Sequence, residues 1–244
     1  MTDEQPGSRR HGEGLMTGMT RGDPVWWSGG LDQSRPRPLV VVVTGALGGG
    51  RECLPLLTRL VRRGHAVVAA RLSGVLRHTG RPGLPLSRLI DRYTRVALTE
   101  RTSVIGFDLG GRLALGAALA DTRIRVVQLV GAPVARLFDE PELLLSLPAH
   151  ALDALVRVTG ADRRELLPKV LGGLALRPET LYPLSGLVRV GYAADDPLTP
   201  PQDLALLKLT LEHCEFRAFA GERGTPPGGR AVRLWLLEGV TRRR

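Results

Sequence analysis

Residues 103–111 read Ser-Val-Ile-Gly-Phe-Asp-Leu-Gly-Gly, so a short apolar run ends in an acidic residue with small residues around it. The apolar part, 103–107, predicts a buried strand, and the small residues that follow predict a helix that begins at once. Glycine at positions 106, 110 and 111 would allow a turn so tight that larger side chains there would clash. Such a turn presents the side chain of Asp108 at the carboxyl end of a central strand.

Asp108 itself is open to two interpretations. Aspartate is a preferred N-cap, so the residue could simply begin the helix that follows it. The run Gly-x-Asp-x-Gly-Gly after a buried strand is more specific than a lone cap, and it favours a turn that presents a reactive group. The positive end of the helix would favour a carboxylate, so we predict that Asp108 is ionised at neutral pH.

Strand-like and helix-like segments alternate outward from this turn. The alternation is typical of an α/β fold with a doubly wound, mostly parallel sheet. Residues 1–37 are rich in Gly, Arg, Pro, Asp and Ser and predict a disordered leader, which Trp26 and Trp27 could anchor to the domain. Residues 134–184 carry helical patterns and no strand, and predict an insertion between the two parts of the core, 38–133 and 185–244. We expect strands at 39–43, 65–72, 103–107, 125–130, 187–191 and 215–218, and helices at about 51–63, 86–98, 110–119, 201–211 and 231–240.

The composition of the chain disfavours several classes of protein. Its 244 residues are 43% hydrophobic but contain no apolar run of the ~20 residues that a membrane span needs, so we expect a soluble cytoplasmic protein. The formal charge of +10 comes almost entirely from scattered arginines, without the aromatic residues that stack on bases, so we expect no nucleic-acid partner. The cysteines, Cys53 and Cys214, are too few for a disulfide scaffold or a cysteine zinc site, and we expect no metal and no cofactor.

The first loop of the core strengthens the interpretation of the turn. Residues 44–50 read Thr-Gly-Ala-Leu-Gly-Gly-Gly after a buried strand, and with the turn at Asp108 they resemble the oxyanion loop and nucleophile elbow of the α/β-hydrolase superfamily. The resemblance covers most of residues 38–241. It implies that the N–H group of Ala46 or Leu47 pairs with that of Leu109 to form an oxyanion hole.

A later loop extends the same resemblance. Residues 191–200 read Gly-Tyr-Ala-Ala-Asp-Asp-Pro-Leu-Thr-Pro, which is similar to the loop that carries the acid of the hydrolase triad. The match makes Asp196 the equivalent of that acid, with Asp195 a close second. The insertion 134–184 occupies the place of the lid in the superfamily.

Two of the three triad positions depart from the usual pattern. Asp108 stands where most members carry serine, and residues 221–227, Gly-Glu-Arg-Gly-Thr-Pro-Pro, lack the histidine that usually follows the last strand. Serine needs a base to remove its proton, whereas aspartate needs no such activation. These departures argue against ordinary ester hydrolysis.

An aspartate at the elbow also resembles haloalkane dehalogenases and epoxide hydrolases. Those enzymes attack carbon with the carboxylate and then hydrolyse the ester with water that a histidine activates. Only His78 and His150 could supply a relocated base, because His65 and His213 precede their strands and belong to the other edge of the sheet. Each of these histidines also has a simpler interpretation as a surface residue.

The loop 44–50 admits a rival interpretation as the nucleotide-binding turn of short-chain dehydrogenases, with Arg71 near a 2′-phosphate. Arg51 breaks the expected glycine spacing, and Tyr93 lacks a lysine four residues later. We therefore disfavour a dehydrogenase.

Three hypotheses about function follow. The first is a non-hydrolytic cyclase or lyase of bacterial specialised metabolism that acts on a small apolar, polyketide-like substrate, with Asp108 as an acid, base or hydrogen-bonding group. The second is a hydrolase of epoxide, ester or haloalkane type with Asp108 as nucleophile. The third is a non-catalytic binding protein. A homodimer stays an open alternative to a monomer.

Overall fold

A computed structural model describes residues 25–47, 50–73, 84–220 and 229–241. Its strands form one sheet in the order β1-β3-β2-β4-β5-β6-β7, in which β1 is antiparallel to β3 and all other pairs are parallel. The strands are β1 (Val25–Gly29), β2 (Arg37–Val43), β3 (Ala66–Ala70), β4 (Ala97–Phe107), β5 (Ile124–Val130), β6 (Leu187–Ala193) and β7 (Cys214–Phe219). The predicted doubly wound, mostly parallel sheet is therefore confirmed.

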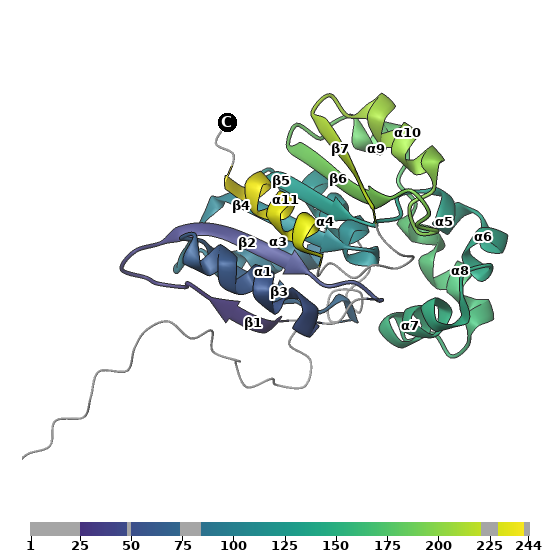
Figure 1. Ribbon diagram of the computed structural model, residues 1–244, viewed down its shortest axis with the longest axis horizontal. Helices are drawn as coiled ribbons and strands as arrows, with labels where there is room; N and C mark the ends of the chain where they lie inside the picture. Colours follow the sequence, from purple (N-terminus) through teal and green to yellow (C-terminus); the bar gives the residue numbers. More distant parts are fainter. Residues whose placement is uncertain (1–24, 48–49, 74–83, 221–228, 242–244) are drawn as a thin grey trace, which may run out of the picture.

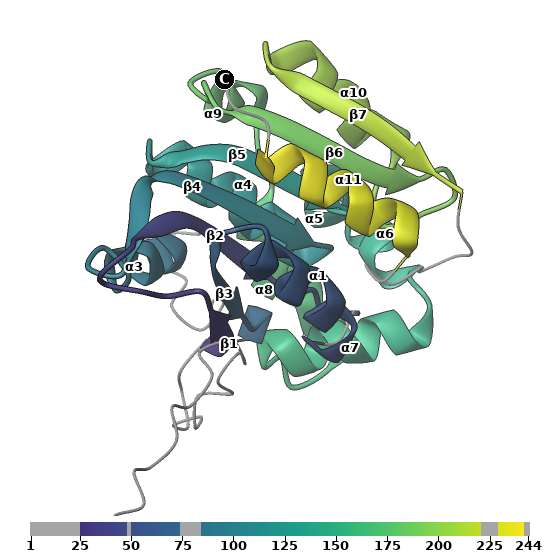
Figure 2. The same cartoon turned by 60° about the vertical axis from the view of Figure 1, so that its left-hand side comes forward.

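Helices cover both faces of this sheet, as Figures 1 and 2 show. The long helices are α1 (Gly50–Arg62), α3 (Leu84–Asp91), α4 (Leu109–Ala120), α7 (Ala149–Thr159), α10 (Pro201–Thr210) and α11 (Arg230–Thr241). The short ones are α5 (Arg136–Asp139), α6 (Pro141–Leu145), α8 (Leu167–Leu171) and α9 (Pro178–Leu181), with 3₁₀ turns η1 (Arg164–Leu166) and η2 (Gly172–Leu174). Between β5 and β6 the described chain thus contains helices and loops but no strand.

The sheet separates two apolar cores because successive side chains of a strand point to opposite faces. In β2, Leu39, Val41 and Val43 pack into the core under α3, α4 and the helices of 136–181. Val40 and Val42 pack into the second core under α1 and α11. A strand buried on both faces needs the continuous apolar run that β2 has.

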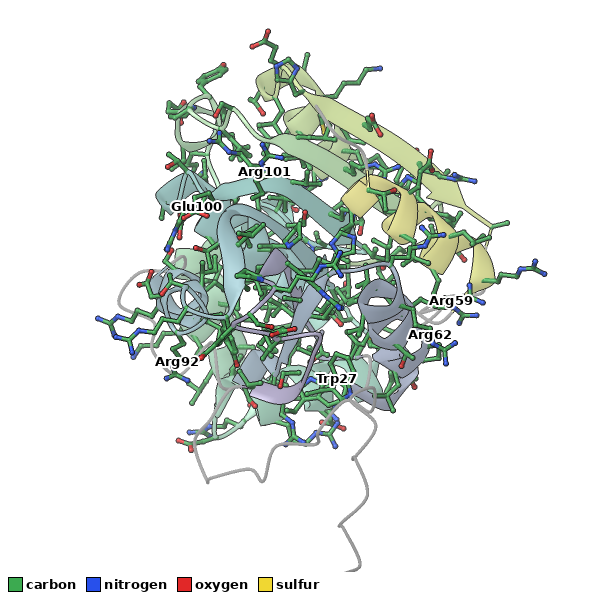
Figure 3. The ribbon with its side chains drawn as sticks, turned by 90° about the vertical axis from the view of Figure 1, so that its left-hand side faces the viewer. Trp27, Arg59, Arg62, Arg92, Glu100 and Arg101 are labelled. Atoms are coloured by element: carbon green, nitrogen blue, oxygen red, sulfur yellow. The ribbon has the colours of Figure 1, made fainter. Side chains whose placement is uncertain are left out.

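The edge strand β1 was missed by the sequence analysis. Residues 25–29 do not belong to a disordered leader, because they pair with β3 and bury Trp26 and Trp27 against α1. A short polar-flanked segment at a sheet edge has little hydrophobic signal of its own, and its partner strand decides its structure. Trp27 is labelled beside β1 in Figure 3. Residues 1–24 lie outside the described part.

One predicted helix was too long. The expected helix at 86–98 ends at Asp91, and residues from Ala97 onward already belong to β4. Residues 97–98 pair with the start of β2 before a shift in register, so β4 begins well before the apolar run at 103–107. Tertiary pairing overrides local helical preference here.

The exposed arginines are spread over separate elements. Arg59 and Arg62 belong to α1, Arg92 follows α3, and Arg101 lies in β4, as Figure 3 shows. Among the described residues, no helix is both long and apolar enough to cross a lipid bilayer.

Candidate active site

The carboxyl ends of the central strands gather the predicted site residues. Register pairs Val43 of β2 with Gly106 of β4, Phe107 of β4 with Val130 of β5, and Val130 with Gly191 of β6. The loops that follow these strands therefore meet at one edge of the sheet. They contain Thr44–Leu47, Asp108, Gly131 and Asp196.

Asp108 has the backbone conformation of a nucleophile elbow. Its φ is 40° and its ψ is −122°, and it is the one residue other than glycine with a positive φ in the described part of the chain. A Cβ on Gly106 would lie 2.4 Å from the Cα of Gly111, so the turn tolerates no side chain there. An ordinary N-cap has extended backbone, which makes the elbow the better description.

The carboxylate of Asp108 lies in the pocket of N–H groups that would form the oxyanion hole. Its Oδ1 accepts from the N–H of Ala46 at 2.7 Å and from the N–H of Leu109, and its Oδ2 accepts from the N–H of Leu47 at 3.0 Å. A Cβ on Gly45 would come within 1.8 Å of Oδ2, so glycine is required for this approach. The three predicted N–H groups therefore converge, but on the protein's own carboxylate.

Asp108 is poised to exchange a proton near neutral pH. Burial raises the pKa of Asp108 from 3.8 to about 6, against the lowering effect of the three N–H donors, and the charge of Asp196 adds to the rise. At this pKa the carboxyl group is mostly ionised at pH 7, but burial shifts its pKa in the direction opposite to the one expected from the positive end of the helix.

Asp196 lies beside the elbow in a loop that its own side chain braces. Its carboxylate accepts from the N–H of Leu198 at 2.9 Å and from the hydroxyl of Thr199 at 3.4 Å. A Cβ on Gly131 would lie 2.7 Å from Asp196 Oδ2, so the side chain reaches the end of β5. Burial raises the pKa of Asp196, and the neighbouring Asp195, which is exposed, adds to this.

A narrow apolar pocket opens directly above Asp108. Its free volume is about 10 Å³, which is roughly the space of one water molecule. The walls come from the oxyanion loop, the elbow and helices α5, α7 and α8. They are formed by Ala46, Leu47, Asp108, Leu109, Pro133, Leu137, Phe138, Ala151, Leu155, Leu171 and Leu198. Apart from the Asp108 carboxylate, the lining side chains are apolar.

No histidine of the described segments lines this pocket. His150 is exposed near the start of α7, and its side chain is absent from the pocket wall, so the structure does not support it as a relocated base. His65 and His213 lie just before β3 and β7, at the opposite edge of the sheet, as predicted. His78 and the segment 221–227 lie outside the described residues.

Two buried charged residues near the site were missed by the sequence analysis. Asp203 in α10 is 1% exposed and accepts from the N–H groups of Val134, Ala135 and Arg136, which holds the start of α5 against the core. Arg112 in α4 is 3% exposed and lies one turn beyond Asp108. An i, i+4 relation to the elbow was the one available signal for Arg112.

Among the described residues, no cluster of three or more His, Cys, Asp or Glu side chains could hold a metal ion.

Comparison with known proteins finds relatives through structure. No protein-family model matches the chain, and no curated protein sequence matches it. Two solved structures of AbyA5 are 27% and 28% identical in sequence, with TM-scores of 0.76 and 0.78, and they cover 86% and 92% of this chain. A 2,6-dihydroxy-pseudo-oxynicotine hydrolase covers 88% of the chain at a TM-score of 0.69 and 15% identity. The chain spans 64–65% of the length of these three structures.

The mostly parallel seven-stranded sheet and the helices that cover it match the fold of these solved structures. The chain therefore has the α/β-hydrolase fold.

Proposed function

We propose that this protein is a non-hydrolytic enzyme of cyclase or lyase type that acts on an apolar, polyketide-like substrate in bacterial specialised metabolism. One observation carries the proposal: the Asp108 carboxylate fills the group of N–H donors at the floor of an apolar pocket, with its pKa raised to about 6. A buried carboxyl group with this pKa can take up and return a proton at neutral pH.

The proposed reaction begins with removal of a proton from a carbon next to a substrate carbonyl. Asp108 takes the proton, and the electron pair moves onto the carbonyl oxygen to give an enolate. The enolate then expels a leaving group from the β carbon, as in a lyase, or attacks an electrophilic carbon of the same molecule, as in a cyclase. Protonated Asp108 returns the proton to the leaving group or to the oxygen that becomes negative.

The N–H donors can serve both the enzyme and the substrate during this step. While Asp108 is ionised, the N–H groups of Ala46, Leu47 and Leu109 stabilise its charge. When it accepts a proton, the negative charge passes to the substrate oxygen, and rotation of the neutral carboxyl group away from the donors would let them bind the enolate oxygen instead.

The helical segment 136–181 acts in this proposal as the lid of the pocket. Leu137, Phe138, Leu155 and Leu171 come from this segment and close over Asp108. A free volume of about 10 Å³ admits no organic molecule, so substrate entry requires the lid to move. The leucine-rich lining then selects an apolar substrate and excludes water.

A hydrolase with Asp108 as nucleophile is the second candidate. Asp108 Oδ2 accepts from Leu47 alone, so it keeps a lone pair that could attack carbon. The covalent ester would then need a base, and in the described part of the chain no histidine reaches the pocket. The hydrolase relative named above is 15% identical and shares the fold, which carries no argument for the reaction.

The test begins with the natural substrate, taken as the compound that accumulates when the gene is deleted from its host. Purified wild type, Asp108→Asn and Asp108→Ala are then compared on that compound, with Glu142→Gln, an exposed residue of α6, as control. We expect both Asp108 variants to lose about 100-fold or more in kcat and the control to match wild type. Full activity in both variants would show the proposal to be wrong.

Reaction in heavy-oxygen water separates the two candidates. Mass spectrometry of the Asp108 peptide after several turnovers detects label only if the carboxylate forms an ester that water cleaves. We expect an unlabelled peptide. Label at Asp108 would replace the cyclase or lyase with the hydrolase.

A further inference from the structure

Arg112 of α4 is a buried cation with too few partners. Its Nε donates to the carbonyl oxygen of Leu174 in η2, while Nη1 is buried and has no hydrogen-bond partner. Within the described ranges no carboxylate forms an ion pair with it. A guanidinium carries five N–H donors, and burial of such a charge without an anion is unfavourable.

The position of Arg112 connects it with the pocket. Asp108 is the N-cap of α4 and Arg112 is the fourth residue of that helix, so their backbones lie about 6 Å apart along the helix axis. The carbonyl that it holds belongs to Leu174, and η2 directly follows α8, whose Leu171 lines the pocket. The guanidinium therefore contacts the segment that directly follows α8, although Arg112 itself does not line the pocket.

Movement of the lid would expose this cation. The pocket is too small for an organic molecule while the lid is closed, and a movement of α8, whose Leu171 lines the pocket, would carry the adjoining η2 with it. Such a movement would separate Leu174 from Arg112 and leave a guanidinium with free donors on α4, the helix that begins directly after Asp108. Among nearby charges, the carboxylates of Asp108 and Asp196 would repel an anion at the elbow itself.

We infer that Arg112 binds an acidic group of the substrate, so that the natural substrate is an apolar molecule that carries a carboxylate or a similarly acidic enol. The anion would sit one helical turn from Asp108, with the apolar part along the leucines of the lid. This inference rests on the proposed function, because it takes the pocket above Asp108 as the substrate site.

Binding of octanoate and of its neutral counterpart octanamide tests the inference by calorimetry at pH 7.5. We expect wild type to bind octanoate about tenfold or more tightly than octanamide, because charge-assisted hydrogen bonds are stronger than neutral ones. In Arg112→Gln, which keeps a donor for the Leu174 carbonyl, the preference should vanish while octanamide binding stays within about threefold. Arg59→Met, at an exposed arginine of α1, is the control that removes a positive charge elsewhere.

A second neutral variant, Arg112→Met, provides the same test if Arg112→Gln does not fold. The thermal unfolding temperature of each variant is measured. Equal binding of the two probes by wild type, no octanoate binding, or a preference that survives in both neutral variants would overturn the inference. So would equal weakening of both probes together with a lowered unfolding temperature, which is the result expected of a purely structural Arg112. The binding assay needs no turnover, and Asp108→Asn should still prefer octanoate over octanamide. Failure of the proposed reaction is therefore distinguishable from failure of this inference.

Discussion

An arginine is buried on each face of the sheet, and the two differ in how many partners the folded chain supplies for the guanidinium. Arg189 in β6 is 1% exposed and lies under α11, where Nη1 donates to Gln128 Oε1 at 2.9 Å and to the carbonyl of Trp235 at 2.8 Å. Its Nε donates to Glu215 at 2.9 Å. Arg112 on the other face has one acceptor, the carbonyl of Leu174.

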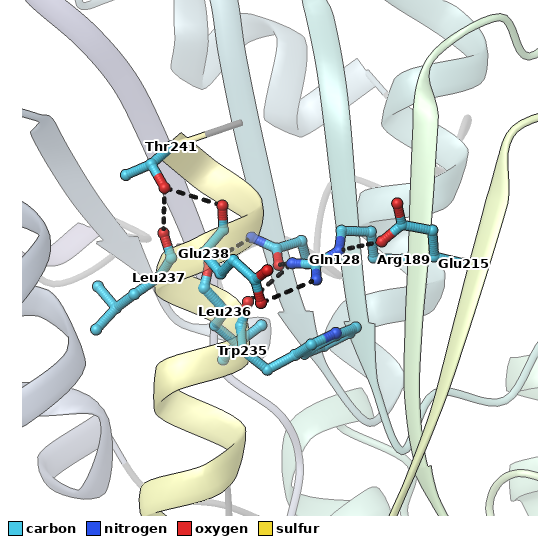
Figure 4. Close-up of polar contacts among 8 residues, drawn as sticks. All are labelled: Gln128, Arg189, Glu215, Trp235, Leu236, Leu237, Glu238 and Thr241. Carbon is cyan, nitrogen blue, oxygen red and sulfur yellow. Dashed lines mark hydrogen bonds and ion pairs between the residues drawn. The ribbon is translucent and has the colours of Figure 1, made fainter. Parts of the chain in front are cut away.

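The network around Arg189 holds α11 against β5, β6 and β7, as Figure 4 shows. Gln128 completes it by donating to the carbonyl of Leu236 at 3.0 Å, and the guanidinium stacks over the Trp235 ring at 4.4 Å. Each partner is supplied by the folded chain, so this charge serves the fold. A buried charge whose partners are not supplied by the chain is the better place to look for a ligand.

The largest expected effect comes from removal of the satisfied arginine. Arg189→Met leaves Gln128, Glu215 and the carbonyl of Trp235 without their donor, so we expect a loss of about 3–5 kcal/mol in the free energy of unfolding. Urea denaturation measures it, with Arg59→Met as the matched surface control. A loss below that of the control would mean that the network contributes nothing to stability.

The next effect tests whether the network depends on a small residue in α11. A Cβ on Gly239 would lie 1.9 Å from Arg189 Nη1 and 2.3 Å from Gln128 Oε1, so Gly239→Ala should cost about 3 kcal/mol of stability. The same substitution should cost less in an Arg189→Met background, because the closer of the two clashing groups is gone and Gln128, no longer held by Arg189, can move. Equal costs in the two backgrounds would rule out this coupling.

Asp108 is a buried carboxylate that accepts three hydrogen bonds, yet burial still makes its ionised form unfavourable. The pKa of Asp108 is about 6 in the folded chain against 3.8 in the unfolded chain, so the folded state favours the protonated carboxyl group. The resulting stabilisation is complete below pH 4 and is lost as the pH rises through 6. Relative to Asp108→Asn, which does not ionise, wild type should lose about 2 kcal/mol between pH 4 and pH 7. Urea denaturation at both pH values measures this, and a constant difference would exclude the raised pKa.

The smallest effect is expected at Arg112, where the fold gains little from the charge. Arg112→Gln should unfold within about 1 kcal/mol of wild type, or above it, because removal of an unpaired buried ion relieves its cost of desolvation. Urea denaturation beside Arg189→Met gives the contrast directly. A loss as large as that of Arg189→Met would make the two arginines alike and remove the reason to assign a ligand to Arg112.

The sequence by itself determined the central strands, the helices between them and the elbow at Asp108, because continuous apolar runs and glycine spacing are local signals. It also identified the N–H groups of Ala46, Leu47 and Leu109 and the neighbouring Asp196, through resemblance to a superfamily. Whether these residues act in catalysis remains a prediction. It missed β1 and extended the helix before β4, since pairing with a neighbouring strand decides both segments.

Tertiary structure alone decided what the site residues do to one another. The occupation of the N–H groups by Asp108 needs β2 and β4 in register and no side chain at Gly45. The contrast between Arg112 and Arg189 depends on partners from η2, β5, β7 and α11, which lie 26 to 62 residues away along the chain. The sequence shows that an arginine is present, but burial and the supply of acceptors are properties of the packed chain, and they set its energy.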